Sequence, residues 1–184
     1  MAKDVVPPLS ALKAKYPHPD RYSRKAIYDE IGLTMPEGPQ WENTCALRMS
    51  YCLLRCDIKL GKETGRGTET LIRQGPHKDK HIWLSRKNLA KRVKEIFGAP
   101  TISVVSANKD FEVLKEKIGK GGGIISFGKL AADERDSEYA GGHIDVGYYT
   151  TWLYFWDDLE MMMGHNFRRL FGRAEQVEFW KSPA

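Results

Sequence analysis

The chain has 184 residues, 41% of them hydrophobic and 29% charged, with a formal net charge of +5 and a pI near 9.0. A chain of this length and composition can bury the core of one domain, expected over residues 1–184, without disulfides or a structural metal. No apolar run approaches the roughly 18 residues of a membrane span, so we expect no membrane partner, and the positive charge suggests an acidic one.

The N-terminal part of the chain predicts short helices and no secretory signal. Residues 1–8 lack the basic and then apolar pattern of a cleavable signal peptide, so any export is expected to use another route. One helix is expected around residues 9–15 and a second over residues 21–32, where Gly32 would end it.

The most informative stretch surrounds Cys45. Asn43 and Thr44 are both good N-cap residues, and no proline or glycine interrupts the chain from Ala46 to Cys56. Cys45 is therefore expected in the first turn of a helix, where the positive end of the helix dipole favours a thiolate. This position makes Cys45 a candidate nucleophile. The alternative is a buried cysteine that packs as a small hydrophobic residue.

The cysteine count argues against both a disulfide and a metal site. The total is odd, and Cys52 and Cys56 are expected on the same helix as Cys45, with poor geometry for a bridge. The spacing matches no zinc-ligand pattern. We expect three thiols, no metal and no cofactor.

The middle of the chain predicts alternating strands and helices. The expected elements are a strand at residues 81–84, a helix that Ser85 caps and Gly98 ends, a strand at 101–105, a helix capped by Asn108, and a strand at 124–127. The glycine run at 119–123 precedes a strand and lacks the Gly-Lys-Ser/Thr ending of a phosphate loop. It is therefore better explained as a turn than as a nucleotide site.

His143 is the candidate base, at the start of a predicted hairpin. One strand runs from His143 to about residue 149 and the next covers residues 152–156, so the turn is expected near Thr150. If Thr150 is its centre, His143 faces Asp157; a two-residue turn would instead place it opposite Asp158. Asp145 shares the face of His143 but lies farther off. The expected order of preference for the acid is Asp157, Asp158 and then Asp145.

Together these residues form a candidate nucleophile, base and orienting group. A thiolate activated by an imidazole can attack an amide carbonyl, and an acidic residue can hold the imidazole in place. Helix N-terminal N–H groups near Cys45 could stabilise the oxyanion. A helix-borne cysteine followed 143 − 45 = 98 residues later by a histidine on a strand is the order found in papain-like peptidases.

Residues 43–53, Asn-Thr-Cys-Ala-Leu-Arg-Met-Ser-Tyr-Cys-Leu, resemble the nucleophile segment of the fourth family of type VI secretion amidase effectors. These bacterial toxins belong to the papain-like cell-wall peptidases. Residues 82–84, 97–100 and 120–127, and the Gly-His-Ile-Asp-Val run that contains His143, follow in that family's order. The resemblance covers roughly residues 40–147.

The resemblance implies an α+β, papain-like fold with the nucleophile at a helix N-terminus packed against an antiparallel sheet. It also implies an antibacterial peptidoglycan amidase that cleaves the stem peptide between D-glutamate and meso-diaminopimelate through an acyl-enzyme. The implied partners are the type VI secretion apparatus and an immunity protein. The implied place of action is the periplasm of a target Gram-negative cell, reached without a signal peptide.

Two features depart from that family. The strand after His143 lacks the family's Leu-Trp-Asn/Asp-Gly turn, which leaves the third catalytic residue open among Asp157, Asp158 and Asp145. The family's paired cysteines beyond the histidine are absent, so no disulfide is implied.

The alternative function is a non-catalytic basic module that binds nucleic acid or wall peptide. One predicted helix carries five cations, namely Arg86, Lys87, Lys91, Arg92 and Lys94. They alternate with Glu95 and an apolar face, as on any solvated helix. We therefore expect no nucleic-acid partner.

Overall fold

The computed structural model describes residues 3–37, 44–63, 70–105, 110–130, 142–152, 156–162 and 167–183. The helices in these ranges are α1 (Leu9–Lys15), α2 (Arg24–Ile31), α3 (Cys45–Arg55), α4 (Arg86–Phe97), α5 (Phe111–Ile118) and α6 (Phe167–Arg173). The strands are β1 (Ile102–Val105), β2 (Gly122–Leu130), β3 (His143–Trp152), β4 (Trp156–Met161) and β5 (Ala174–Lys181). No helix among these residues is long and apolar enough to cross a membrane.

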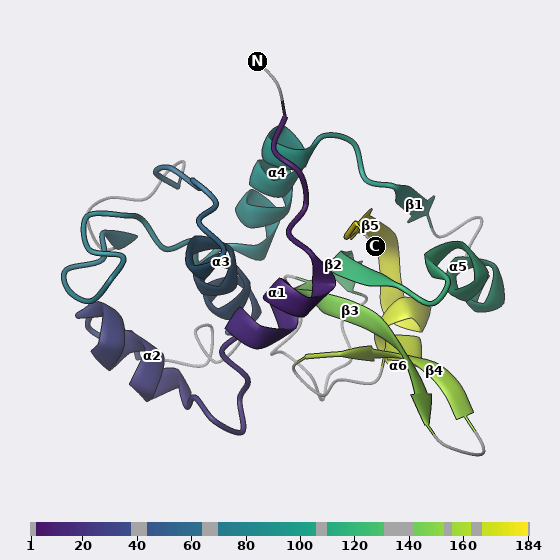
Figure 1. Cartoon of the computed structure of the whole chain (residues 1–184), viewed down its shortest axis with the longest axis horizontal. Helices are drawn as coiled ribbons and strands as arrows, with labels where there is room; N and C mark the ends of the chain where they lie inside the picture. The colour runs from purple at the N-terminus through teal and green to yellow at the C-terminus, as the bar shows by residue number, and fades with distance from the viewer. Residues whose placement is uncertain are drawn as a thin grey trace.

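The strands form one antiparallel sheet in the order β1-β5-β2-β3-β4, and helices cover both of its faces. Neighbouring residues of β2 point to opposite faces, so Ile124 joins a core shared with α1, α2, α3 and α4, whereas Ile125 joins a core shared with α5 and α6. Figure 1 shows the two groups of helices on either side of the sheet. The predicted α+β class is confirmed.

The central helix, α3, begins at Cys45, as the capping pattern predicts. Every residue from Cys45 to Leu54 is buried, because α3 packs between β3 and the helices α1 and α4. Its N-cap, Thr44, makes no side-chain capping bond; its hydroxyl instead accepts a hydrogen bond of 2.9 Å from Nε of Arg48. The start of α3 is thus fixed by packing and by a buried arginine.

The predicted hairpin register is wrong. β3 continues to Trp152, and it pairs with β4 so that Thr151 faces Asp157 and Thr150 faces Asp158. Thr150 and its neighbour continue the strand because β-branched residues favour strands and no glycine or asparagine marks a turn there. Thr151 lies eight residues from His143, roughly 27 Å at about 3.4 Å per residue. Neither Asp157 nor Asp158 is therefore opposite the histidine.

The strand predicted at residues 81–84 is also absent; only His81 forms an isolated bridge, with Leu71. The physical reason lies in Glu63, a fully buried carboxylate that accepts hydrogen bonds from the backbone N–H groups of Leu84 and Ser85 at 2.9 and 3.1 Å. A side chain thus satisfies donors that a strand partner would otherwise take.

The predicted start of α4 and the predicted end of α2 are confirmed. Ser85 caps α4 through a bond from the N–H of Asn88, and Gly32 ends α2 in the left-handed conformation, at φ 65°. Helix α5 is capped by Asp110, and the predicted cap, Asn108, lies outside the described residues.

Candidate active site

Cys45 occupies the N-terminal position of α3 and is only 2% exposed. The first N–H groups of a helix have no partner within it and concentrate positive potential there. Cys52 lies within the same helix and Cys56 is its C-cap, and no disulfide joins the three cysteines, as predicted. Cys45 is thus the thiol at the positive end of α3.

His143 begins β3 and lies between the Cys45 thiol and the Asp145 carboxylate. Its Nε2 is 3.3 Å from Oδ2 of Asp145, and the other ring nitrogen, Nδ1, is buried. Burial lowers the pKa of His143, but hydrogen bonds with Asp145 and Cys45, together with their charges, outweigh this and raise it to about 9. The imidazole is therefore protonated at neutral pH.

Asp145 is fully buried, and its two oxygens have different partners. One oxygen, Oδ1, accepts a 2.7 Å hydrogen bond from the N–H of Val146, while the other faces His143. The bond to the adjacent backbone fixes the carboxylate plane, so the carboxylate can hold the imidazole in one orientation.

Tyr16 lies on the other side of this carboxylate. Its hydroxyl is buried and makes no hydrogen bond of normal geometry to the described residues, but the charge of Asp145 acts on it. Burial, and then the charge of Asp145, raise the pKa of Tyr16 well above its ordinary value, so the hydroxyl keeps its proton. Tyr16 can therefore act only as a donor toward Asp145.

Arg48 fixes the segment that follows Tyr16. It is buried, and its Nη1 donates hydrogen bonds to the carbonyl oxygens of Pro17 and Tyr22. Because its Nε also donates to Thr44, next to Cys45, one side chain joins the start of α3 to this segment. Arg48 is thus a structural brace of the site.

A cavity of about 560 Å³ lies beside this site rather than over it. Its lining includes Tyr16 but not Cys45, His143 or Asp145, and it carries the cations Lys13, Arg21 and Arg55. In the described part of the chain, no three His, Cys, Asp or Glu side chains come together in a way that could hold a metal.

The structure brings together Cys45 and His143, the predicted nucleophile and base, and adds Asp145, which the sequence ranked third. Asp145 lies two residues along the same strand, and its Oδ2 is 3.3 Å from Nε2 of His143, closer than the sequence predicts. Sequence reasoning missed Tyr16 entirely, because a tyrosine after a short helix far from both motifs carries no local signal.

Known proteins match the chain in sequence and fold. The family model described as "Type VI secretion system (T6SS), amidase effector protein 4" matches residues 41–180. The crystal structure of the type VI effector Tae4 from Enterobacter cloacae has a TM-score of 0.60 at 18% identity, covering 99% of this chain and 100% of that one. No curated protein sequence matches the chain.

A second solved structure is the Tae4–Tai4 effector–immunity complex from Salmonella Typhimurium, with a TM-score of 0.57 at 15% identity, covering 96% of this chain and 99% of that one. These likenesses establish the papain-like fold. Because the family model spans most of the chain, the chain belongs to the amidase effector protein 4 family of the type VI secretion system, a family of peptidoglycan amidases.

Proposed function

We propose that this protein is a cysteine amidase that cuts the peptidoglycan stem peptide between D-glutamate and meso-diaminopimelate. Cys45 is the nucleophile, His143 the acid and base, and Asp145 the residue that orients the histidine. The observation that carries the proposal is the position of His143 between a thiol and a carboxylate, with its pKa raised to about 9.

The steps follow from that protonation state. The Cys45 thiolate attacks the amide carbonyl, and N–H groups at the start of α3 are suited to stabilise the oxyanion. As the intermediate collapses, the C–N bond breaks and the His143 imidazolium gives its proton to the departing amine. The neutral imidazole then takes a proton from water, which attacks the thioester. The C–S bond breaks, the acid product leaves, and the Cys45 thiolate and the His143 imidazolium are restored.

The reacting pair is enclosed, since Cys45 is 2% exposed and His143 is fully buried. Substrate entry therefore requires a displacement of the chain around the thiol. An enclosed site has a low dielectric, which strengthens the interaction between imidazolium and thiolate and excludes bulk water.

Delivery and partners are proposed from the family. The protein would be exported by the type VI secretion apparatus and act in the periplasm of a Gram-negative target cell. An immunity protein is the expected partner, because related effectors crystallise as effector–immunity complexes.

The test is to incubate purified Gram-negative sacculi with the wild type, Cys45→Ala and Cys56→Ala, and to identify new peptide ends by mass spectrometry. We expect new D-glutamate carboxyl termini and diaminopimelate amino termini from the wild type and Cys56→Ala, and a loss of at least about 10³-fold in Cys45→Ala. Equal product from Cys45→Ala would refute the nucleophile. Binding of sacculi without any cleavage would instead support a non-catalytic wall-binding module.

A further inference from the structure

Arg86, the first residue of α4, places a guanidinium group beside the catalytic histidine. Gly142 directly precedes His143, and a Cβ atom at Gly142 would lie only 2.8 Å from Nε and 3.0 Å from Cζ of Arg86. Gly142 also has φ +88° and lies against the carbonyl oxygen of Phe127. The lack of a side chain at Gly142 thus allows the guanidinium to lie close to the backbone at the start of β3.

The charge of Arg86 acts on the reacting thiol. Burial lowers the pKa of Arg86, while the charges of Cys45 and Glu178 raise it, and an arginine stays protonated under these conditions. Glu178 also lies 3.8 Å from Lys94, so its charge is shared between two cations. The guanidinium of Arg86 therefore interacts electrostatically with both Cys45 and Glu178.

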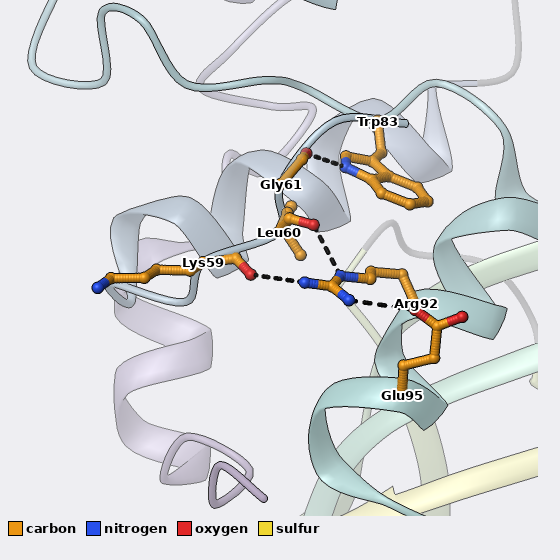
Figure 2. Close-up of polar contacts among 6 residues, drawn as sticks. All are labelled: Lys59, Leu60, Gly61, Trp83, Arg92 and Glu95. Carbon is orange, nitrogen blue, oxygen red and sulfur yellow. Dashed lines mark hydrogen bonds and ion pairs between the residues drawn. The ribbon is translucent and has the colours of Figure 1, made fainter. Parts of the chain in front are cut away.

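Arg92, six residues later on α4, shows what a purely structural arginine does in this helix. Its guanidinium donates hydrogen bonds to the carbonyl oxygens of Leu60 and Lys59 at 2.7 and 3.3 Å, and it pairs with Glu95 at 3.1 Å (Figure 2). Trp83 donates to the same segment, at Gly61. Arg92 thus anchors residues 59–61, whereas Arg86 lies beside the reacting groups.

The proposed substrate carries a carboxylate close to the amide bond that is cut. In the stem peptide, D-glutamate is joined to diaminopimelate through its side-chain carboxyl, so its main-chain carboxylate remains ionised a few bonds from the scissile amide. The planar guanidinium matches a carboxylate with two parallel hydrogen bonds. We propose, building on the function proposed above, that Arg86 binds this carboxylate and thereby selects stem peptides whose D-glutamate is not amidated.

The test compares two synthetic stem peptides that differ only in D-glutamate or D-isoglutamine, the latter carrying a carboxamide in place of the carboxylate. We expect the wild type to prefer the carboxylate peptide by about 10- to 100-fold in kcat/KM, since an arginine-to-carboxylate pair exceeds a neutral contact. Arg86→Gln should abolish this preference, because its loss of activity is larger on the carboxylate peptide than on the carboxamide peptide, and Arg86→Lys should keep part of the preference. Arg92→Gln is the matched control, with a lower melting temperature and an unchanged preference.

Other outcomes separate the alternatives. An equal loss on both peptides in Arg86→Gln would overturn the proposal, because it would assign Arg86 to stabilising the thiolate. An unchanged preference would also overturn it. If the wild type cleaves neither peptide, the hydrolase proposal fails, and Arg86 is then judged by binding of both peptides to Cys45→Ala. Tighter binding of the carboxylate peptide to Cys45→Ala, lost when Arg86→Gln is added to that variant, supports the carboxylate site. Equal affinities of Cys45→Ala for the two peptides reject it.

Discussion

The two ends of α3 carry similar chemical groups in opposite arrangements. At the N-terminal end, Cys45 contacts His143, and the hydroxyl of Tyr16 faces a carboxylate. At the other end, the Cys52 thiol donates a 3.5 Å hydrogen bond to the carbonyl oxygen of Leu12 and interacts electrostatically with the Cys56 thiol.

A tyrosine, a carboxylate and a histidine are present at this second end as well. The hydroxyl of Tyr51 donates to Glu30 at 2.6 Å, and the ring of His77 packs against the ring of Tyr51 at 5.7 Å, perpendicular to it. Burial, and then the charges of Lys80 and Arg55, lower the pKa of His77. The two ends therefore differ in arrangement: at the N-terminal end the imidazole lies between a thiol and a carboxylate, and at the other end it packs against a tyrosine ring.

The largest expected effect after loss of the nucleophile comes from the orienting carboxylate. Asp145→Asn should lower kcat by about 10²–10⁴-fold, because an amide can neither hold the imidazole in the required tautomer nor stabilise its charge. Glu30→Gln is the matched control, since it alters a carboxylate that contacts a tyrosine at the other end of α3, and it should keep full kcat. Asp157→Asn should also be fully active. A large loss in Asp157→Asn, with Asp145→Asn unaffected, would restore the sequence-based choice.

The pH profile should separate the two histidines. The active form needs a protonated His143, whose pKa is about 9, so kcat/KM should stay high at neutral pH and fall about tenfold per unit above pH 9. Asp145→Asn should move this alkaline limb to lower pH, because the carboxylate raises the pKa. His77→Gln should leave the limb in place. A limb near pH 6.5 in the wild type would contradict the thiolate and imidazolium pair.

The sequence predicts the parts of this site that depend on local rules. Capping residues, an uninterrupted helical run and a Gly-His strand start are enough to propose Cys45 and His143, which the structure places next to each other. The register that placed Asp157 opposite His143 was wrong because the hairpin has no turn residue that fixes it, so a shift of several residues left the local pattern unchanged. Tyr16 and Arg86 depend on contacts between distant segments, and one sequence carries no local signal for such contacts.

The smallest effect should come from the tyrosine hydroxyls. Tyr16→Phe should lower kcat about three- to tenfold with KM unchanged, because it removes a buried polar group beside the charge of Asp145, a change worth about 1 kcal/mol. In an Asp145→Asn background, Tyr16→Phe should add nothing further. Tyr51→Phe removes the matching hydroxyl at the other end of α3; it should lower the free energy of unfolding by about 1 kcal/mol and leave kcat unchanged. Equal losses of kcat in both variants, or additivity with Asp145→Asn, would show that the hydroxyl of Tyr16 does not act through Asp145.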